Sequence, residues 1–396
     1  MRRTLKTAIC SAAVVCSGAL SGSALSAQAA ARAELNSEGL ASQIVRSLAL
    51  EPGERVLLVG HPGFADALIR PLRIAVAEAG GVDMGFIEVL SQPWPSGDTG
   101  EAYGRSAAQA QATFREMFDG RIDATVFLPG STTAHPAYAA IQELLNEGQG
   151  RAIHFHWAAN GSVLTIPGQP VPPAYVVDRM YERAVLETDY PALAAVQREF
   201  EAAMRAGEVR VTTPAGTDLR FRIGDRPVNL QDGNASPSRT ARGRVLVDRE
   251  IELPAGVIRV APMEESVQGR IVFELSTWRG RTVKDLALDF TNGTITSVSA
   301  ASGRDAVEAE LDGAGPEARR LREFALGFNP LLAVPAEGRW IPYYGYGAGA
   351  VRLSLGDNLE LGGAVGGGYF RWNFFEDATV WVDGDLWVQD GRLVNR

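Results

Sequence analysis

Apolar runs alternate with helical patterns along the first half of the chain. Residues 55–60, RVLLVG, form a continuous apolar run of the kind found in strands buried on both faces. Residues 65–81 follow with apolar positions at helical spacing and end in two glycines. Further apolar runs at 85–90, 124–130 and 152–158 are separated by helical patterns. This alternation predicts an α/β domain with a mostly parallel sheet.

The pattern changes after a predicted helix at 191–206. Beyond Gly207, short alternating strands are broken by Gly, Pro, Asp and Asn, as is typical of antiparallel sheets. One helical pattern, GPEARRLREFALGF at 315–328, interrupts these strands, and aromatic-rich strands follow it. The sequence therefore predicts an N-terminal α/β domain over residues 30–207 and a β-rich α+β C-terminal domain over residues 208–396.

The first 29 residues have the pattern of a secretory signal. Arg2, Arg3 and Lys6 precede an apolar run of small residues, which ends in an A-x-A-like site at Ala29. The run is shorter than the roughly 20 residues that span a bilayer, so we expect a cleaved signal peptide and not an anchor. We therefore expect an exported protein, periplasmic or secreted, without a membrane span after cleavage.

Cleavage would change the chemistry of the chain in two ways. Both cysteines, Cys10 and Cys16, lie inside the signal, so the mature chain would form neither disulfides nor zinc–thiolate sites. The signal also carries three positive charges, and losing them would make a chain of net charge −9 more acidic still. Such a charge argues against nucleic acid as a partner.

An arginine stands out in the segment GAVRLSLGDN at 349–358. Val351, Leu353 and Leu355 alternate as in a half-buried strand, which places Arg352 on the opposite face. A Gly-Asp-Asn turn signal follows at once, so Arg352 is predicted near a strand end, where sites are often built.

Four segments of the second half are distinctive when taken together: residues 209–228, 253–273, 321–332 and 349–358, which residues 371–393 continue. They resemble successive signature segments of the aminopeptidase T and S family of metallopeptidases, to which dihydroxypyridine dioxygenases are similar in sequence. The resemblance implies the architecture of that family, in which two divalent metal ions lie in the second domain. It also implies a homodimer.

The family's metal-ligand positions are mostly occupied by residues that cannot bind metal. The resemblance places Val257, Glu323, Arg352, Arg371 and Asn373 at these positions, so only Glu323 keeps the family's ligand. A guanidinium offers no lone pair and stays protonated, and valine has no donor atom. We therefore expect a degenerate site without a metal cofactor, in a pseudoenzyme without ordinary metal-dependent aminopeptidase activity.

Two interpretations of these substitutions stay open. If Arg352 and Arg371 both reach Glu323, they form an Arg-Glu-Arg cluster, either as a structural ion pair that neutralises a buried carboxylate or as a pocket. Such a pocket, with Asn373, would bind a small anionic or peptide carboxylate ligand. Aromatic residues near these arginines suit either a ligand wall or a core: Tyr343, Tyr344, Tyr346, Tyr369 and Trp372.

Enzymatic alternatives also stay open. His154 and His156 are two apart on a predicted strand and share one face, so they are candidates for a relocated metal site of a hydrolase or dioxygenase-like enzyme. Glu323 is a candidate general base without metal. A third class is a structural protein that uses its aromatic, glycine-rich tail to bind a partner.

Overall fold

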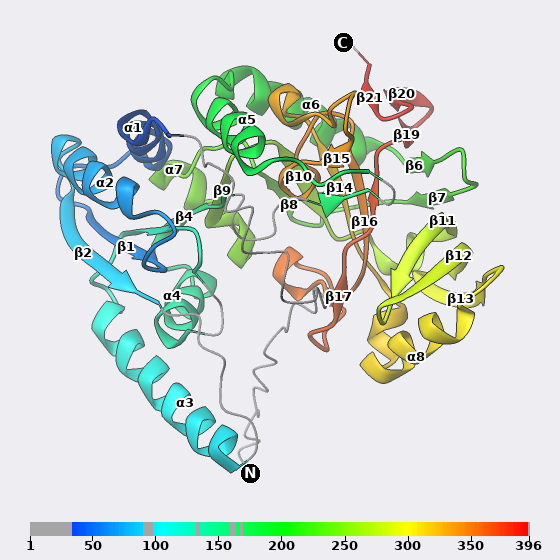
Figure 1. Ribbon diagram of the computed structural model, residues 1–396, viewed down its shortest axis with the longest axis horizontal. Coiled ribbons are helices and arrows are strands. Elements are labelled where there is room, and N and C mark those ends of the chain that lie inside the picture. Colours follow the sequence, from blue (N-terminus) through cyan, green and yellow to red (C-terminus); the bar gives the residue numbers. More distant parts are fainter. Residues whose placement is uncertain (1–33, 90–97, 132–134, 158–163, 167–168, 395–396) are drawn as a thin grey trace.

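The computed structural model describes residues 34–89, 98–131, 135–157, 164–166 and 169–394. The expected signal at 1–29 lies outside the described residues. A mostly parallel sheet with helices occupies one side of the molecule, and two larger, mostly antiparallel sheets occupy the other (Figure 1). This arrangement confirms the predicted fold class and is consistent with two domains.

The parallel sheet, here called sheet A, has five strands in the order β2-β1-β3-β4-β9. Its strands are β1 (Arg55–Gly60), β2 (Val82–Glu88), β3 (Ala124–Phe127), β4 (Arg151–Phe155) and β9 (Glu250–Leu253). The predicted strand RVLLVG is β1, residue for residue. Because β9 comes from beyond residue 207, the chain returns to sheet A after it has begun the second part of the fold. The boundary expected near Gly207 stays a prediction.

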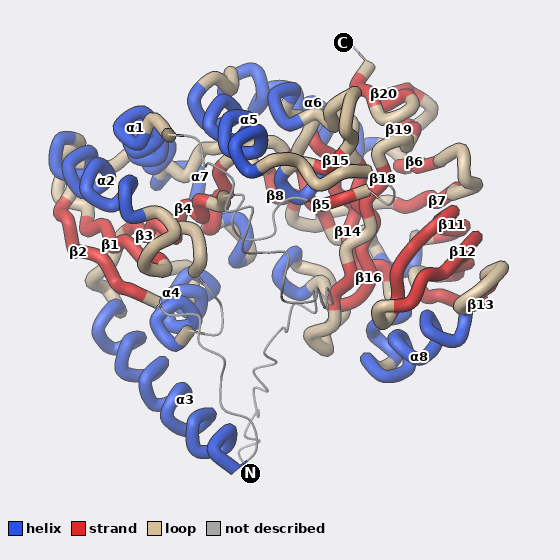
Figure 2. The backbone as a smooth tube through the Cα atoms, viewed as in Figure 1, coloured by secondary structure: helices blue, strands red, loops and turns tan. Residues whose placement is uncertain are grey.

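Helices cover both faces of sheet A (Figure 2). They are α1 (Ser37–Leu48), α2 (Asp66–Glu78), α3 (Asp98–Phe118) and α4 (Pro136–Asn146), and α5 (Ala174–Leu186) and α6 (Tyr190–Ala206) follow. Val56 and Leu58 of β1 share one apolar cluster with α1 and α2, whereas Leu57 and Val59 share another with α4. Burial on both faces explains why β1 is apolar throughout.

The other sheets hold most of the second half of the chain. A six-stranded sheet contains β8 (Val228–Leu230), β10 (Val257–Val260), β14 (Leu321–Gly327), β16 (Val351–Gly356), β17 (Phe370–Arg371) and β18 (Phe374–Phe375). An eight-stranded sheet has the order β13-β12-β11-β7-β6-β19-β20-β21, with bounds Thr294–Ser299, Arg281–Thr291, Gln268–Trp278, Asp218–Phe221, Val209–Thr212, Thr379–Val382, Asp385–Gln389 and Arg392–Leu393. The short strands β5 (Leu164–Thr165) and β15 (Trp340–Ile341) pair with each other.

Short helices connect these strands. They are α7 (Pro237–Thr240) and α8 (Arg304–Ala314), and the 3-10 turns η2 (Leu246–Asp248), η3 (Glu264–Ser266), η4 (Pro316–Arg319), η5 (Pro330–Leu332), η6 (Tyr343–Gly345) and η7 (Leu359–Leu361). In the part of the chain that the structure describes, no helix has both the length and the apolar character needed to cross a membrane.

The helix expected at 315–328 is wrong. This segment forms the turn η4 and then the strand β14, which lies inside the six-stranded sheet between β10 and β16. Every residue of β14 is buried, including Arg322 and Glu323. Arg322 and Glu323 contributed to the helical pattern of the segment, although both are buried among partners that are distant in the sequence.

Candidate functional site

The candidate site is built on β14 and its two neighbouring strands. Arg259 of β10 and Arg352 of β16 both lie opposite Ala325 of β14, one on each side. Glu323 is two residues from Ala325, so in regular strand geometry the two side chains share a face. The small side chain of Ala325 leaves room on that face for two arginines to reach Glu323.

The carboxylate of Glu323 is fully buried and both of its oxygens are in contact with cations. The Nε of Arg259 donates a hydrogen bond to Oε2 at 3.0 Å, and the Nε of Arg352 lies 2.8 Å from Oε1. The Ser354 hydroxyl also donates to Oε1 at 2.9 Å. Burial alone would raise the pKa of Glu323, but the nearby arginines outweigh it and hold this pKa far below its usual value.

The cluster therefore differs from the expected one by one arginine. Among the described residues, Arg371 pairs with Glu310 at 3.0 Å and not with Glu323. Its guanidinium also lies 3.6 Å from the centre of the Trp278 ring. The expected cluster of Arg352, Glu323 and Arg371 is thus corrected to Arg259, Glu323 and Arg352, because the neighbours of β14 in the sheet are β10 and β16.

Arg259 is not among the site residues predicted from the sequence, although the sequence contains a signal for it. Arg259 interrupts the apolar run VIRVA at 257–261, and a charged residue inside a buried strand needs a partner of opposite charge. Burial alone would lower the pKa of Arg259, but Glu323 and Glu360 raise it well above the usual value. Arg259 therefore stays charged within the sheet.

The other two predicted positions have structural contacts. The Nδ2 of Asn373 donates to the carbonyl of Leu353 at 3.0 Å, and its Oδ1 accepts from Arg371 at 3.3 Å. Val257 is buried and lies opposite Gly327 of β14. Neither residue forms a hydrogen bond or an ion pair with Glu323.

The residues at this position do not fit a pair of divalent metal ions. Such ions need several lone-pair donors, whereas the groups that surround Glu323 are two guanidiniums and a hydroxyl. The described residues also contain no group of three or more His, Cys, Asp or Glu side chains arranged to hold a metal. We therefore derive no chemistry through a metal at this position.

His154 and His156 lie together at the carboxyl end of β4. Their rings stack with centroids 3.7 Å apart, and the Nδ1 of His154 lies 2.9 Å from the Oε1 of Glu250 on β9. The Tyr138 hydroxyl donates to the same oxygen at 3.0 Å. Burial and the neighbouring His154 both lower the pKa of His156 well below its usual value. His154 is thus oriented by a carboxylate, as a catalytic histidine is, whereas both rings are also packed, as those of core histidines are.

Aromatic side chains separate this histidine pair from the arginine cluster. Tyr344 contacts His156 on one side and Trp372 on the other, with ring centroids 5.5 Å and 5.3 Å apart. The guanidinium of Arg352 lies 5.3 Å from the Trp372 ring and donates to the Tyr344 carbonyl at 3.0 Å. Tyr343 and Tyr344 both adopt positive φ, of 37° and 52°, a strained conformation that often occurs at functional sites.

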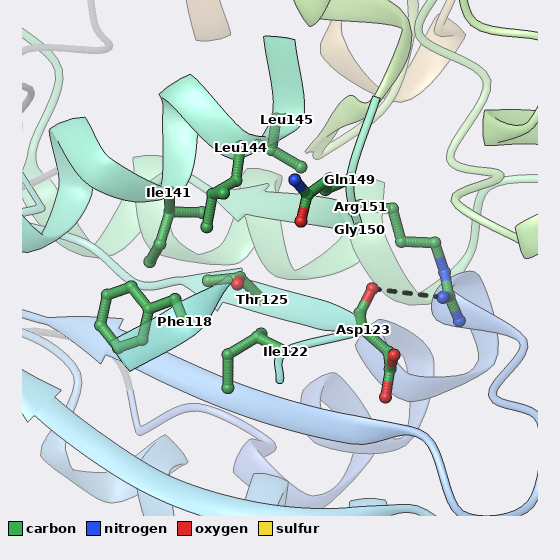
Figure 3. A pocket seen from close by; sticks show the side chains of 10 residues that line it. All are labelled: Phe118, Ile122, Asp123, Thr125, Ile141, Leu144, Leu145, Gln149, Gly150 and Arg151. Atoms are coloured by element: carbon green, nitrogen blue, oxygen red, sulfur yellow. Dashed lines mark hydrogen bonds between the residues drawn. The ribbon is translucent and has the colours of Figure 1, made fainter. Parts of the chain in front are cut away.

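The small cavity in Figure 3 lies elsewhere, between sheet A and α4. It is lined by Phe118, Ile141 and Leu144 on its apolar side and by Asp123 and Arg151 on its polar side. Its volume of about 20 Å³ accommodates roughly one water molecule. This cavity is therefore too small for a substrate.

The comparisons with known proteins agree with the fold and with the resemblance in the sequence. Residues 193–331 match the family model of the thermophilic metalloproteases, M29. AmpT from Thermus thermophilus has a TM-score of 0.56 and 20% identity, over 91% of this chain and 99% of that chain. The 2,5-dihydroxypyridine dioxygenase from Pseudomonas putida has a TM-score of 0.59 and 14% identity, over 91% and 97%.

No curated protein sequence matches the chain. At these identities the two solved structures establish the fold alone. Residues 193–331 are thus similar to the thermophilic metalloprotease (M29) family, and the described chain shares its fold with AmpT and with the dioxygenase.

Proposed function

We propose that this is an exported, aminopeptidase-like protein in which a buried ion-pair cluster has replaced the family's dinuclear metal site. One observation carries the proposal. Arg352, at a family ligand position, occupies one oxygen of Glu323, and Arg259 occupies the other. Two fixed positive charges thus neutralise the carboxylate that metal ions would otherwise neutralise. The protein accordingly acts by binding and not by metal-assisted hydrolysis.

Export and dimerisation are parts of the same proposal that depend on other observations. The basic residues and the small apolar run before Ala29 support export. The likeness to AmpT supports a homodimer only through the family. A small anionic or peptide carboxylate remains the ligand class that we propose, since the cluster contains more guanidiniums than carboxylates.

The proposal is tested by metal analysis of residues 30–396, purified without chelator or affinity tag. We expect less than about one-tenth equivalent of zinc, cobalt, manganese or iron by inductively coupled plasma mass spectrometry. We also expect no chelator-sensitive release of leucine from leucyl-4-nitroanilide. One equivalent or more of bound metal, or release that a chelator abolishes, would overturn the proposal.

A second candidate is an enzyme centred on the histidine pair. The contact between His154 and Glu250 favours it, since a carboxylate that accepts from Nδ1 leaves Nε2 free to act as a base or a metal ligand. In this case replacement of His154 and His156 by alanine would remove a bound metal or abolish a hydrolytic activity that the Glu323→Gln variant retains. If the wild-type protein has neither, this candidate is excluded.

A further inference from the structure

The outer part of the arginine cluster is built by an irregularity in β14. Leu321 and Glu323 lie opposite Leu355 and Ser354, which are consecutive, so Arg322 is an extra residue with no partner on β16. Bulges of this kind redirect a side chain. Arg322 is consequently on the same side of the sheet as Arg259, and both donate to a single carboxylate, that of Glu360.

Glu360 differs from the other members of the cluster in its exposure. Its side chain is 38% exposed, whereas those of Arg259 and Arg322 are 8% and 5% exposed and that of Glu323 is completely buried. One oxygen, Oε1, accepts from both arginines, at 2.8 Å from the Nη2 of Arg259. Glu360 is thus the most exposed of these four side chains.

The backbone that carries Glu360 is anchored independently of its side chain. The turn η7 is closed by hydrogen bonds from Leu361 to the Asn358 carbonyl and from Gly362 to the Leu359 carbonyl, both 3.0 Å long. Arg226 donates to the Gly362 carbonyl. Because these contacts do not involve the carboxylate, the side chain can rotate away from the arginines while the turn stays in place.

The charges around Glu360 favour an anion in its position. Three guanidiniums, from Arg259, Arg322 and Arg352, form ion pairs with two carboxylates among the described residues, and without Glu360 the carboxylate of Glu323 would be their one ion-pair partner there. The Nε of Arg322 is buried and has no acceptor among the described residues. The Arg322 guanidinium also lies 5.3 Å from the Phe370 ring, so an apolar wall lies beside the charged groups.

We propose that Glu360 is a tethered occupant of a carboxylate-binding site formed by Arg259 and Arg322, and that an external carboxylate displaces it. The ligand class is a small monocarboxylate with an apolar body. The carboxylate matches the planar fork of a guanidinium, and the apolar body lies against Phe370. This inference rests on the proposed function, because it requires arginines and not metal ions at this position.

Benzoate tests the site directly, with benzamide as its uncharged counterpart. By calorimetric titration we expect Glu360→Gln and Glu360→Ala to bind benzoate about tenfold or more tightly than the wild-type protein does, since the competing internal carboxylate is gone. Addition of Arg322→Gln to either variant should abolish the gain, and benzamide should bind none of them measurably. Glu376→Gln is the matched control, because it removes a carboxylate from the separate pair with Arg339.

Each outcome decides the proposal. If both Glu360 variants fold, as judged by circular dichroism, and bind benzoate no more tightly than the wild-type protein, the site does not exist. If the gain survives Arg322→Gln, the carboxylate binds elsewhere. Metal analysis of the same preparations distinguishes the two proposals. Bound metal overturns the proposed function, whereas equal benzoate affinities of the Glu360 variants and the wild-type protein overturn only this site.

Discussion

Replacement of Glu323 by glutamine is the sharpest test of the buried cluster. The substitution keeps the shape of the side chain and removes its charge, so that Arg352 loses the one carboxylate with which it forms an ion pair among the described residues. Arg259 keeps its contact with Glu360. The variant therefore creates one uncompensated guanidinium, of which only 3% of the side chain is exposed.

The structure sets the expected size of the effect. Removal of one partner from a buried ion pair costs about 3–5 kcal/mol of unfolding free energy, since the remaining charge stays desolvated. At about 2 °C per kcal/mol for a long chain, this corresponds to a melting temperature lower by about 6–10 °C. The pKa of Glu323 is lowered in the fold, so its contribution is present above the unfolded pKa of about 4.3 and is lost as the pH falls below it.

Thermal unfolding at pH 7, followed by circular dichroism, measures this effect. Glu187→Gln is the matched control because its pair with Arg183 is more than half exposed on both sides, and we expect a change of about 0.5 kcal/mol or less. A loss below about 1 kcal/mol for Glu323→Gln would refute the reasoning. It would mean that Glu323 is solvated or protonated, and the cluster would not be the ion pair described.

Two further predictions concern side chains around the cluster. His156→Gln should flatten the pH dependence of stability between pH 7 and 5.5. The lowered pKa keeps His156 neutral in the folded wild-type protein, so that below the unfolded pKa of about 6.5 only the unfolded chain is protonated, which costs about 1 kcal/mol or more of unfolding free energy. Urea titrations at both pH values, with His61→Gln as the control, measure this difference. Arg371→Gln should lower the unfolding free energy by about 1–2 kcal/mol, because Arg371 contacts Glu310 and Trp278. In the double variant with Glu323→Gln, the two losses of unfolding free energy should add within about 0.5 kcal/mol. A larger coupling would mean that Arg371 does interact with Glu323.

Local periodicity correctly predicted the strand and the helix in which the burial of side chains follows a regular pattern. The strand 55–60 is buried on both faces and is apolar at nearly every position. The helix at 191–206 has an amphipathic pattern and lies within α6. In both cases the burial of a residue follows from its place in the repeat, which the sequence displays directly.

The arginine cluster could be predicted only in part, because its contacts are not local. Glu323 is 64 residues from Arg259 and 31 from Ser354, and the strand order that brings them together is not encoded in any short segment. The resemblance to the family singled out Glu323 and Arg352, which lie in contact in the structure, but it left open whether they meet. The resemblance could not show that the neighbouring strand β10 supplies Arg259, since Arg259 is not at one of the five family ligand positions named above.

The late strand β9 determines when sheet A can be completed as the chain folds. Sheet A needs the pairing of Ile153 with Ile251 and of His154 with Glu252, and β9 reaches the ribosome exit only after β6, β7 and β8 have been made. Until then the edge of β4 is unpaired, and such an edge invites pairing with other chains. A fragment that ends at residue 207 would keep this edge permanently. Sheet A can therefore be completed only after residue 253 is available to pair with β4.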